Sequence, residues 1–160
     1  MNAQQNNLSP LNYKMKIART PELEYRVQTI DLPGISLGTA NRPTMFGAGI
    51  PYSGDLTFED LNLSFLIGEN MADYLEIWSW LMSLGHASDF DSFPKKLTDG
   101  FSDVSILLLN SAMKPKMLYK FIDAYPTNIS SIHLDTTLTD VQYATCSVNF
   151  KYSRYLIETL

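Results

Sequence analysis

Hydrophobic and polar side chains alternate along several short stretches of this chain. Leu11, Tyr13, Met15 and Ile17 alternate with polar or small residues, and a similar alternation runs from residue 23 to 31. The clearest stretch covers residues 61–67, where every second residue is hydrophobic. Because successive side chains of a strand point to opposite faces of a sheet, each stretch predicts a half-buried β-strand.

Three further strands are predicted in the C-terminal half. Residues 104–109 are almost continuously hydrophobic, which is typical of a strand buried on both faces. Residues 110–115 predict a hairpin connection to a partner strand over 117–124, and residues 125–128 predict another turn. The last predicted strand covers residues 143–152, where hydrophobic positions, including Cys146, alternate with polar ones.

Residues 70–85 follow the period of an α-helix. Asn70 is suited to cap its start and Gly85 to end it. Trp80 lies about 200° around the helix from Trp78, so we expect it to pack against a loop or another subunit. The opposite, polar face is predicted to include Asp73 and Glu76. The predicted buried face consists of hydrophobic residues at helical spacing, namely Met71, Tyr74, Leu75, Trp78, Leu81 and Met82.

Two long stretches show no sustained period and are predicted to be loops. Residues 38–55 contain four glycines and two prolines, and residues 86–103 are polar and rich in Asp and Ser. Long ordered loops in compact domains usually have a function. The first loop carries hydrophobic side chains that suit a contact between subunits better than a solvated loop, namely Met45, Phe46, Ile50 and Tyr52.

The predicted elements are six or seven strands and one helix, preceded by a polar tail over residues 1–10. One helix is too few for a parallel sheet built of βαβ units, so the sheet must be largely antiparallel. With 160 residues, the chain has room for a single domain over residues 11–160. The expected fold is therefore mainly β, an antiparallel β-sandwich or barrel with one flanking amphipathic α-helix.

Composition narrows the function classes. Nine Tyr and eight Phe against 18% charged residues indicate large buried faces, some of them expected to lie against other copies. No hydrophobic stretch approaches the roughly 18 residues of a membrane-spanning helix, and the first ten residues lack the features of a secretory signal. The net charge of −5 argues against tight nucleic-acid binding, but it is compatible with a wall that DNA slides past.

No pattern of a catalytic, cofactor or metal site is found. Tyr52 occupies the place of the third glycine in a dinucleotide-binding fingerprint, and no Gly-x-Ser-x-Gly elbow occurs. His133 and Asp135 would share a strand face, yet no further ligand stands at a familiar spacing. The single cysteine, Cys146, fits a core position. We therefore expect no enzyme activity, no cofactor and no metal.

Three stretches of the chain carry short motifs whose order and separation can be compared with known families. The first is residues 55–61, D-L-T-F-E-D-L, which open a strand. The second is the aromatic-rich helix around residues 74–80 with its stop at Gly85, and the third is the turn Y-P-T-N-I over 125–129. Together these stretches resemble the tail tube protein family of contractile phages and related injection machines. The resemblance follows the chain from about residue 12 to 152 in order and spacing.

The resemblance implies a structural virion protein of the tail, assembled in the host cytoplasm. It implies hexameric rings that stack into the inner tube, a conduit for DNA that passes without specific binding. The implied partners are other copies of the chain, the tail sheath, baseplate or neck proteins, and the tape-measure protein in the lumen. A tube-initiator, baseplate or tail-terminator ring of the same fold and, more remotely, a monomeric β-sandwich binding module or an enzyme hidden in a β-barrel remain alternatives.

The resemblance also directs attention to the residues that would line the bore and join subunits. A wall for DNA is expected to be polar and neutral or acidic, because a lysine-rich wall would hold the phosphates. The candidate bore-lining residues are the polar positions of two predicted strands, Asn62, Ser64, Thr145, Ser147 and Asn149. The candidate contacts between subunits or rings are Met45, Phe46, Ile50, Tyr52 and Trp80.

Overall fold

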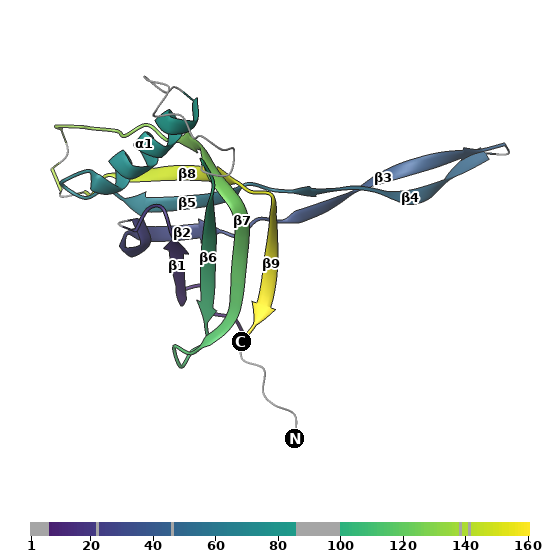
Figure 1. The fold of residues 1–160 in the computed structure, drawn as a ribbon, viewed down its shortest axis with the longest axis horizontal. Coiled ribbons are helices and arrows are strands. Elements are labelled where there is room, and N and C mark those ends of the chain that lie inside the picture. Colours follow the sequence, from purple (N-terminus) through teal and green to yellow (C-terminus); the bar gives the residue numbers. More distant parts are fainter. Residues whose placement is uncertain (1–6, 22, 46, 86–99, 138, 141) are drawn as a thin grey trace.

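The structure is a computed structural model that describes residues 7–21, 23–45, 47–85, 100–137, 139–140 and 142–160. Within these residues it contains nine strands, one short 3-10 helix and one α-helix (Figure 1). In chain order they are β1 (Tyr13–Ile17), η1 (Leu23–Tyr25), β2 (Val27–Asp31), β3 (Ile35–Thr44), β4 (Gly47–Phe58), β5 (Leu61–Leu66), α1 (Ala72–Gly85), β6 (Ser102–Leu109), β7 (Pro115–Ile129), β8 (Thr145–Lys151) and β9 (Arg154–Thr159).

Seven of the strands form one antiparallel sheet that folds over itself. Their order is β1-β6-β7-β8-β5-β2, and β9 pairs with β7. The long strand β7 belongs to both halves, because its first part pairs with β6 and β9 and its second part pairs with β8. We call β1, β6, β9 and the first part of β7 the β6 sheet, and β2, β5, β8 and the second part of β7 the β5 sheet. Figure 1 shows the strands of the two sheets running across each other.

The hydrophobic core lies between the two sheets. The alternation in the sequence correctly predicts the buried faces of β1, β5 and β8, because Ile17, Leu63, Phe65 and Val148 are all fully buried. Cys146 is also buried, as predicted. The mainly β, antiparallel architecture with a flanking helix is thus confirmed.

The helix α1 buries a face that only partly overlaps the predicted one, since Tyr74 and Leu81 pack against the core as predicted but Leu75 is exposed. Trp80 is only 1% exposed, its ring centroid lies 5.8 Å from that of Phe150, and its Nε1 donates a 2.7 Å hydrogen bond to the carbonyl of Gly100. Trp78, predicted to be in the core, is 46% exposed. The prediction was wrong because α1 is hydrophobic on two sides, so helical spacing fits two alternative faces.

Asp73, predicted on the outer face, is buried instead. The helix begins two residues after the predicted cap Asn70, and Met71 has a φ of 52°, in the left-handed region. The carboxylate of Asp73 accepts a 3.1 Å hydrogen bond from the amide of Gly68 and lies 3.4 Å from the guanidinium of Arg26. Asp73 therefore links the start of α1 to the chain before β2.

The first predicted loop, residues 38–55, is a long β-hairpin formed by β3 and β4. Figure 1 shows this hairpin projecting far from the body of the molecule. Its pattern escaped prediction because a projecting two-stranded ribbon has no face against the core, so hydrophobic residues need not alternate. Register shifts after Leu37 and after Arg42 further disturb the period.

Other predicted boundaries also differ. Residues 23–25 form the 3-10 helix η1, and only the second half of the predicted strand 23–31 is extended, as β2. The predicted turn over 125–128 lies inside β7, with a register shift between Pro126 and Asn128 that accommodates the proline. The pairing of β7 with β6 shifts register earlier, between Phe121 and Ala124, next to Asp123 with its φ of 56°. The strand β9 was not predicted, because its exposed residues lack alternation.

Candidate functional site

The projecting hairpin carries exposed hydrophobic side chains along its length. At its tip Met45 is 95% exposed, and Ile50 and Tyr52 on β4 are about half exposed. Nearer the base, Leu37 and Leu56 face each other across the two strands and are also exposed. Phe46, the remaining predicted contact on this segment, lies outside the described residues. Two-stranded hairpins are marginally stable alone in water, so this arm needs a covering surface.

The base of the hairpin is fixed to the body by aromatic side chains. The ring of Phe58, at the end of β4, packs 6.1 Å from Tyr152 and 5.6 Å from Tyr155, measured between centroids. The hydroxyl of Tyr152 donates a 2.7 Å hydrogen bond to the carbonyl of Glu59. The carboxylate of Glu59 in turn accepts a 3.1 Å hydrogen bond from the amide of Gly34, where the chain enters β3. Both strands of the hairpin are therefore tied to the body at the base of the hairpin.

Burial raises the pKa of Tyr152 to about 12, with further contributions from Tyr155, Asp60 and Glu59. The phenol therefore stays protonated at any physiological pH and remains able to donate to Glu59.

Two glycines set the register in the middle of the hairpin. A Cβ on Gly54 would lie 2.9 Å from the carbonyl carbon of Gly38, closer than real side chains approach a backbone. Gly38 is also crowded, with the carbonyl oxygen of Asp55 at 3.3 Å from a Cβ placed there. The strands can run this close at the register shift only because neither residue has a side chain.

The polar positions predicted to line a bore lie together on one face of the β5 sheet. Asn62 pairs with Asn149, Ser64 with Ser147, and Leu66 with Thr145, so the polar positions of β5 and β8 are direct neighbours. The same face continues onto β2 through the pair of Asp31 and Asn62. The opposite positions of both strands are buried in the core. The structure thus brings all five predicted residues onto one polar surface.

The β5 sheet has two strand edges that could extend it. Its strand order is β7-β8-β5-β2, all antiparallel, and β2 pairs only with β5 among the described strands. Residues 125–129 of β7 pair with β8 and with no other described strand. Because the sheet has an even number of strands, placing β2 beside residues 125–129 of a second copy would continue the antiparallel alternation.

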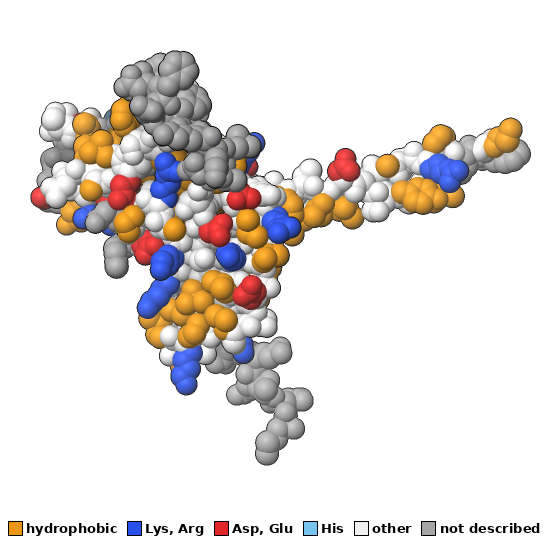
Figure 2. All heavy atoms as spheres, in the orientation of Figure 1, with side chains coloured by type: hydrophobic (Ala, Val, Ile, Leu, Met, Phe, Trp, Pro, Cys, Tyr) orange, Lys and Arg blue, Asp and Glu red, His pale blue; other side chains and the backbone are white. Residues whose placement is uncertain are grey.

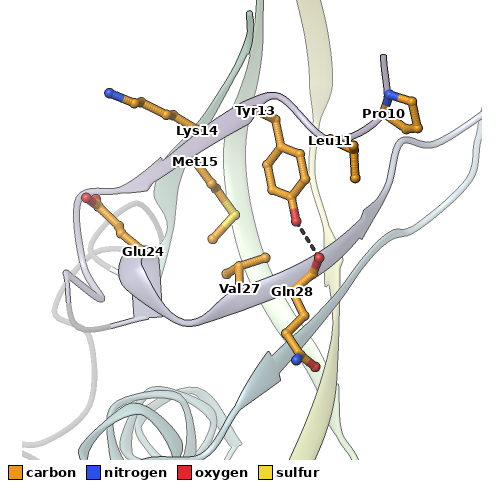
Figure 3. Close-up of a pocket in the computed structure, with 8 residues that line it drawn as sticks. All are labelled: Pro10, Leu11, Tyr13, Lys14, Met15, Glu24, Val27 and Gln28. Carbon is orange, nitrogen blue, oxygen red and sulfur yellow. Dashed lines mark hydrogen bonds between the residues drawn. The ribbon is translucent and has the colours of Figure 1, made fainter. Parts of the chain in front are cut away.

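A groove separates the edge strands β1 and β2. It has a volume of about 610 Å³, and Figure 3 shows Tyr13 and Met15 of β1 extending toward Val27 and Gln28 of β2. The hydroxyl of Tyr13 donates a 2.6 Å hydrogen bond to the carbonyl of Gln28, and partial burial raises the pKa of Tyr13. The two edges are thus held apart by side chains, with no ladder between them.

The remaining candidates for chemistry are scattered over the molecule. His133 and Asp135 lie in an irregular stretch after β7, where a strand had been predicted to align them. The carboxylate of Asp135 accepts hydrogen bonds from the amide and hydroxyl of Thr137, which lower its pKa. His86 lies outside the described residues. Within the described parts of the chain, no cluster of His, Cys, Asp and Glu has the proximity that a metal ion requires.

The structure reverses the predicted positions of the two tryptophans of α1. Trp80 belongs to the core rather than to a contact surface, whereas Trp78, assigned to the core by its spacing, is exposed.

No described helix combines the length and hydrophobicity needed to span a bilayer.

The amino-acid sequence of the chain matches a known protein family. The family model for phage tail tube proteins matches residues 2–158. No curated protein sequence matches the chain.

Solved structures share the fold at low sequence identity. A sheath-tube complex of an extracellular contractile injection system (PVC, extended state) includes a chain with a TM-score of 0.73 and 14% identity, covering 98% of this chain and 95% of that one. The sheath/tube terminator of the same system gives 0.73 and 16%, covering 98% and 99%. The tube-terminating cap of the anti-feeding prophage gives 0.72 and 16%, covering 99% and 95%.

The match to the family model runs over nearly the whole chain, and the fold is that of tube and tube-terminator proteins of contractile injection systems. By that match, this chain belongs to the phage tail tube protein family.

Proposed function

We propose that this protein assembles into rings, and that the rings stack into the hollow inner tube of a contractile phage tail. The observation that carries the proposal is the β5 sheet, which combines a polar face with two strand edges that can pair with neighbours. Edge pairing between β2 and residues 125–129 of β7 would join the sheets of successive subunits into one closed barrel. Its wall would carry Asn62, Ser64, Thr145, Ser147 and Asn149 toward the bore.

The chemistry of this face suits the passage of DNA. Charged side chains lie at its margins, with Asp31 paired to Asn62 on one side and Lys151 paired to Tyr125 on the other, and the centre is made of amides and hydroxyls. Such a wall neither gathers phosphates by counterion release nor repels them strongly. We propose a hexameric ring, the tail as the location of the assembled protein, and the tape-measure protein as an occupant of the bore before DNA.

The hairpin would supply the contacts that hold one subunit to the next. Its exposed hydrophobic residues, Met45, Ile50 and Tyr52, extend well beyond the body and are available to another copy. A contact between two different surfaces repeats along an assembly, which is what a tube of stacked rings requires. The outside of the tube would meet sheath proteins, and its ends would meet baseplate or neck proteins.

A second candidate function is a ring that ends the tube. The tube protein and the two terminators match this chain equally well, with TM-scores of 0.72 to 0.73. A repeating tube subunit and a terminal ring differ in copy number, so quantitative mass spectrometry of purified particles separates them. Copies sufficient for many rings per particle indicate a repeating tube protein, and copies sufficient for only one ring per particle indicate a terminator.

Electron microscopy of the purified protein tests the assembly itself. Rings or hollow rods, with gel-filtration species many times the 18.1 kDa of one chain, are the expected result. A protein that remains monomeric at high concentration, whether or not a tail-end complex is added to start assembly, would rule out the tube. Such a result would favour a small binding module.

A further inference from the structure

The helix α1 has a second hydrophobic face that the described part of its own chain leaves uncovered. Ile77 and Trp80 are buried against the core, whereas Leu75 is 53% exposed and Trp78 is 46% exposed. Met71, at the start of the same face, is also exposed. A helix that is hydrophobic on opposite sides is typical of one packed between two layers. We therefore expect another hydrophobic surface to cover the outer face of α1.

A matching hydrophobic surface lies on the outer face of the β6 sheet. The register places Lys14, Leu107, Leu118 and Glu158 side by side in one row across β1, β6, β7 and β9. The next row contains Leu156, so three leucines adjoin on this face. Figure 2 shows hydrophobic side chains gathered over this part of the body, with Lys and Arg beside them.

The charges of the two surfaces are complementary. Residues 68–85, which lead into and form α1, contain no Lys or Arg and three acidic residues, of which Glu69 is exposed and Asp73 is buried against Arg26. The β6 sheet's outer face carries a surplus of basic residues, although the whole chain has a net charge of −5. Lys120 lies 3.6 Å from Asp103, but Lys14 and Lys16, exposed on β1, flank the leucines. The basic residues of this face are Lys14, Lys16, Lys120 and Arg154, against Asp103 and Glu158.

We propose that the outer face of α1 packs on the outer face of the β6 sheet of a second copy. The helix lies at one end of the body in Figure 1, and the row containing Lys14 and Leu118 lies toward the opposite end of β6 and β7. The contact therefore joins two different surfaces and repeats from copy to copy, as stacking requires. It adds a helix-on-sheet contact to those made by the hairpin and the strand edges, and it rests on the proposed self-assembly.

Disulfide trapping tests this pairing directly, because the native Cys146 is buried. Leu75→Cys protein is mixed with Leu118→Cys protein, assembled and oxidised, and we expect a disulfide-linked dimer in the assembled fraction. The control pairs Leu75→Cys with Leu134→Cys, since Leu134 is exposed but lies outside both surfaces. Rods that form normally but give no more dimer than the control would overturn the helix-on-sheet contact and leave the tube proposal standing.

A charge-reversal experiment avoids cysteines and keeps the core intact. The double variant Lys14→Glu and Lys16→Glu should raise the protein concentration needed for assembly by about tenfold, which corresponds to about 1.4 kcal/mol for the two reversals together. Lys114→Glu, an exposed change in the β6–β7 connection, should leave it unchanged. Equal assembly of both variants would contradict the proposal, as would trapping of α1 to a different protein in intact particles. A wild-type chain that never assembles would overturn the tube and this contact together.

Discussion

The hydroxyl of Tyr152 donates a hydrogen bond of 2.7 Å to the carbonyl of Glu59, and this bond ties the base of the projecting hairpin to the β8–β9 corner. Glu59 also holds the amide of Gly34 through its carboxylate. The same few residues therefore fix both strands of the hairpin where they leave the body. Because an arm transmits any tilt at its base to its tip, this corner sets where Met45 and Tyr52 can reach.

Replacing Tyr152 with Phe should weaken this corner but leave no cavity in it. The ring contacts with Phe58 and Phe121 remain, and only the hydrogen bond is lost, which costs about 1 kcal/mol or less. Urea denaturation of soluble subunits measures the loss, and Tyr143→Phe serves as a control because Tyr143 is 75% exposed. Equal stability of the two variants would show that the hydrogen bond contributes nothing.

Alkaline pH should act on the same bond. The folded state raises the pKa of Tyr152 from 10.0 to about 12, so its contribution to stability is complete below pH 10 and is lost as the pH rises toward 12. Wild-type stability should therefore fall more steeply than that of Tyr152→Phe over this range. Parallel curves for the two proteins would contradict the assignment.

The two tryptophans of α1 should differ sharply in their effect on stability. Trp80→Ala opens a cavity beside Phe150 and is expected to cost about 3 to 5 kcal/mol. Trp78→Ala removes a half-exposed ring and should cost about 1 kcal/mol or less in the isolated subunit. Chemical denaturation decides, and a larger loss for Trp78 would mean that the sequence pattern, and not the structure, identified the core face.

These tryptophans also show where sequence reasoning stops. Alternation was enough to identify β5 and β8, because one side of each strand faces a core and the other side faces solvent. It therefore placed Asn62 and Ser147 correctly on one polar face. A helix hydrophobic on two sides offers two equally regular stripes, and only the tertiary structure selects Trp80 over Trp78.

The hairpin was missed for the opposite reason. Its residues were recognised as too hydrophobic for a solvated loop, but no buried face imposed a period of two on them, and crowding at Gly38 and Gly54 interrupts the register. The hydrophobic character of the segment could therefore be recognised from the sequence, whereas its secondary structure could not.

Gly54→Ala should disturb the hairpin more than the body. The added methyl group would lie 2.9 Å from the backbone of Gly38, so the two strands must separate locally. We expect global stability to change little, since the hairpin lies outside the core, and assembly to be impaired. Gly85→Ala is the control, because nothing lies within 4 Å of a Cβ there. Normal rods from Gly54→Ala protein would show that assembly tolerates a distorted arm.

Polar substitutions at the tip should separate folding from assembly. Met45→Ser combined with Tyr52→Ser removes exposed hydrophobic surface and should leave the denaturation midpoint of the subunit within error. Rod formation should be lost or need much more protein, as seen by light scattering. Hydrogen exchange gives a second readout, because amides of β3 and β4 should become protected on assembly. Unchanged exchange in assembled rods would argue that the hairpin makes no contact.

Cryo-electron microscopy of the assembled wild-type protein tests the central claim most directly. The account predicts a hollow tube in which β2 of each subunit pairs with residues 125–129 of its neighbour, so that Asn62, Ser64, Ser147 and Asn149 face the bore. A tube with the polar face of the β5 sheet turned outward, or subunits joined without pairing of these two edges, would contradict it.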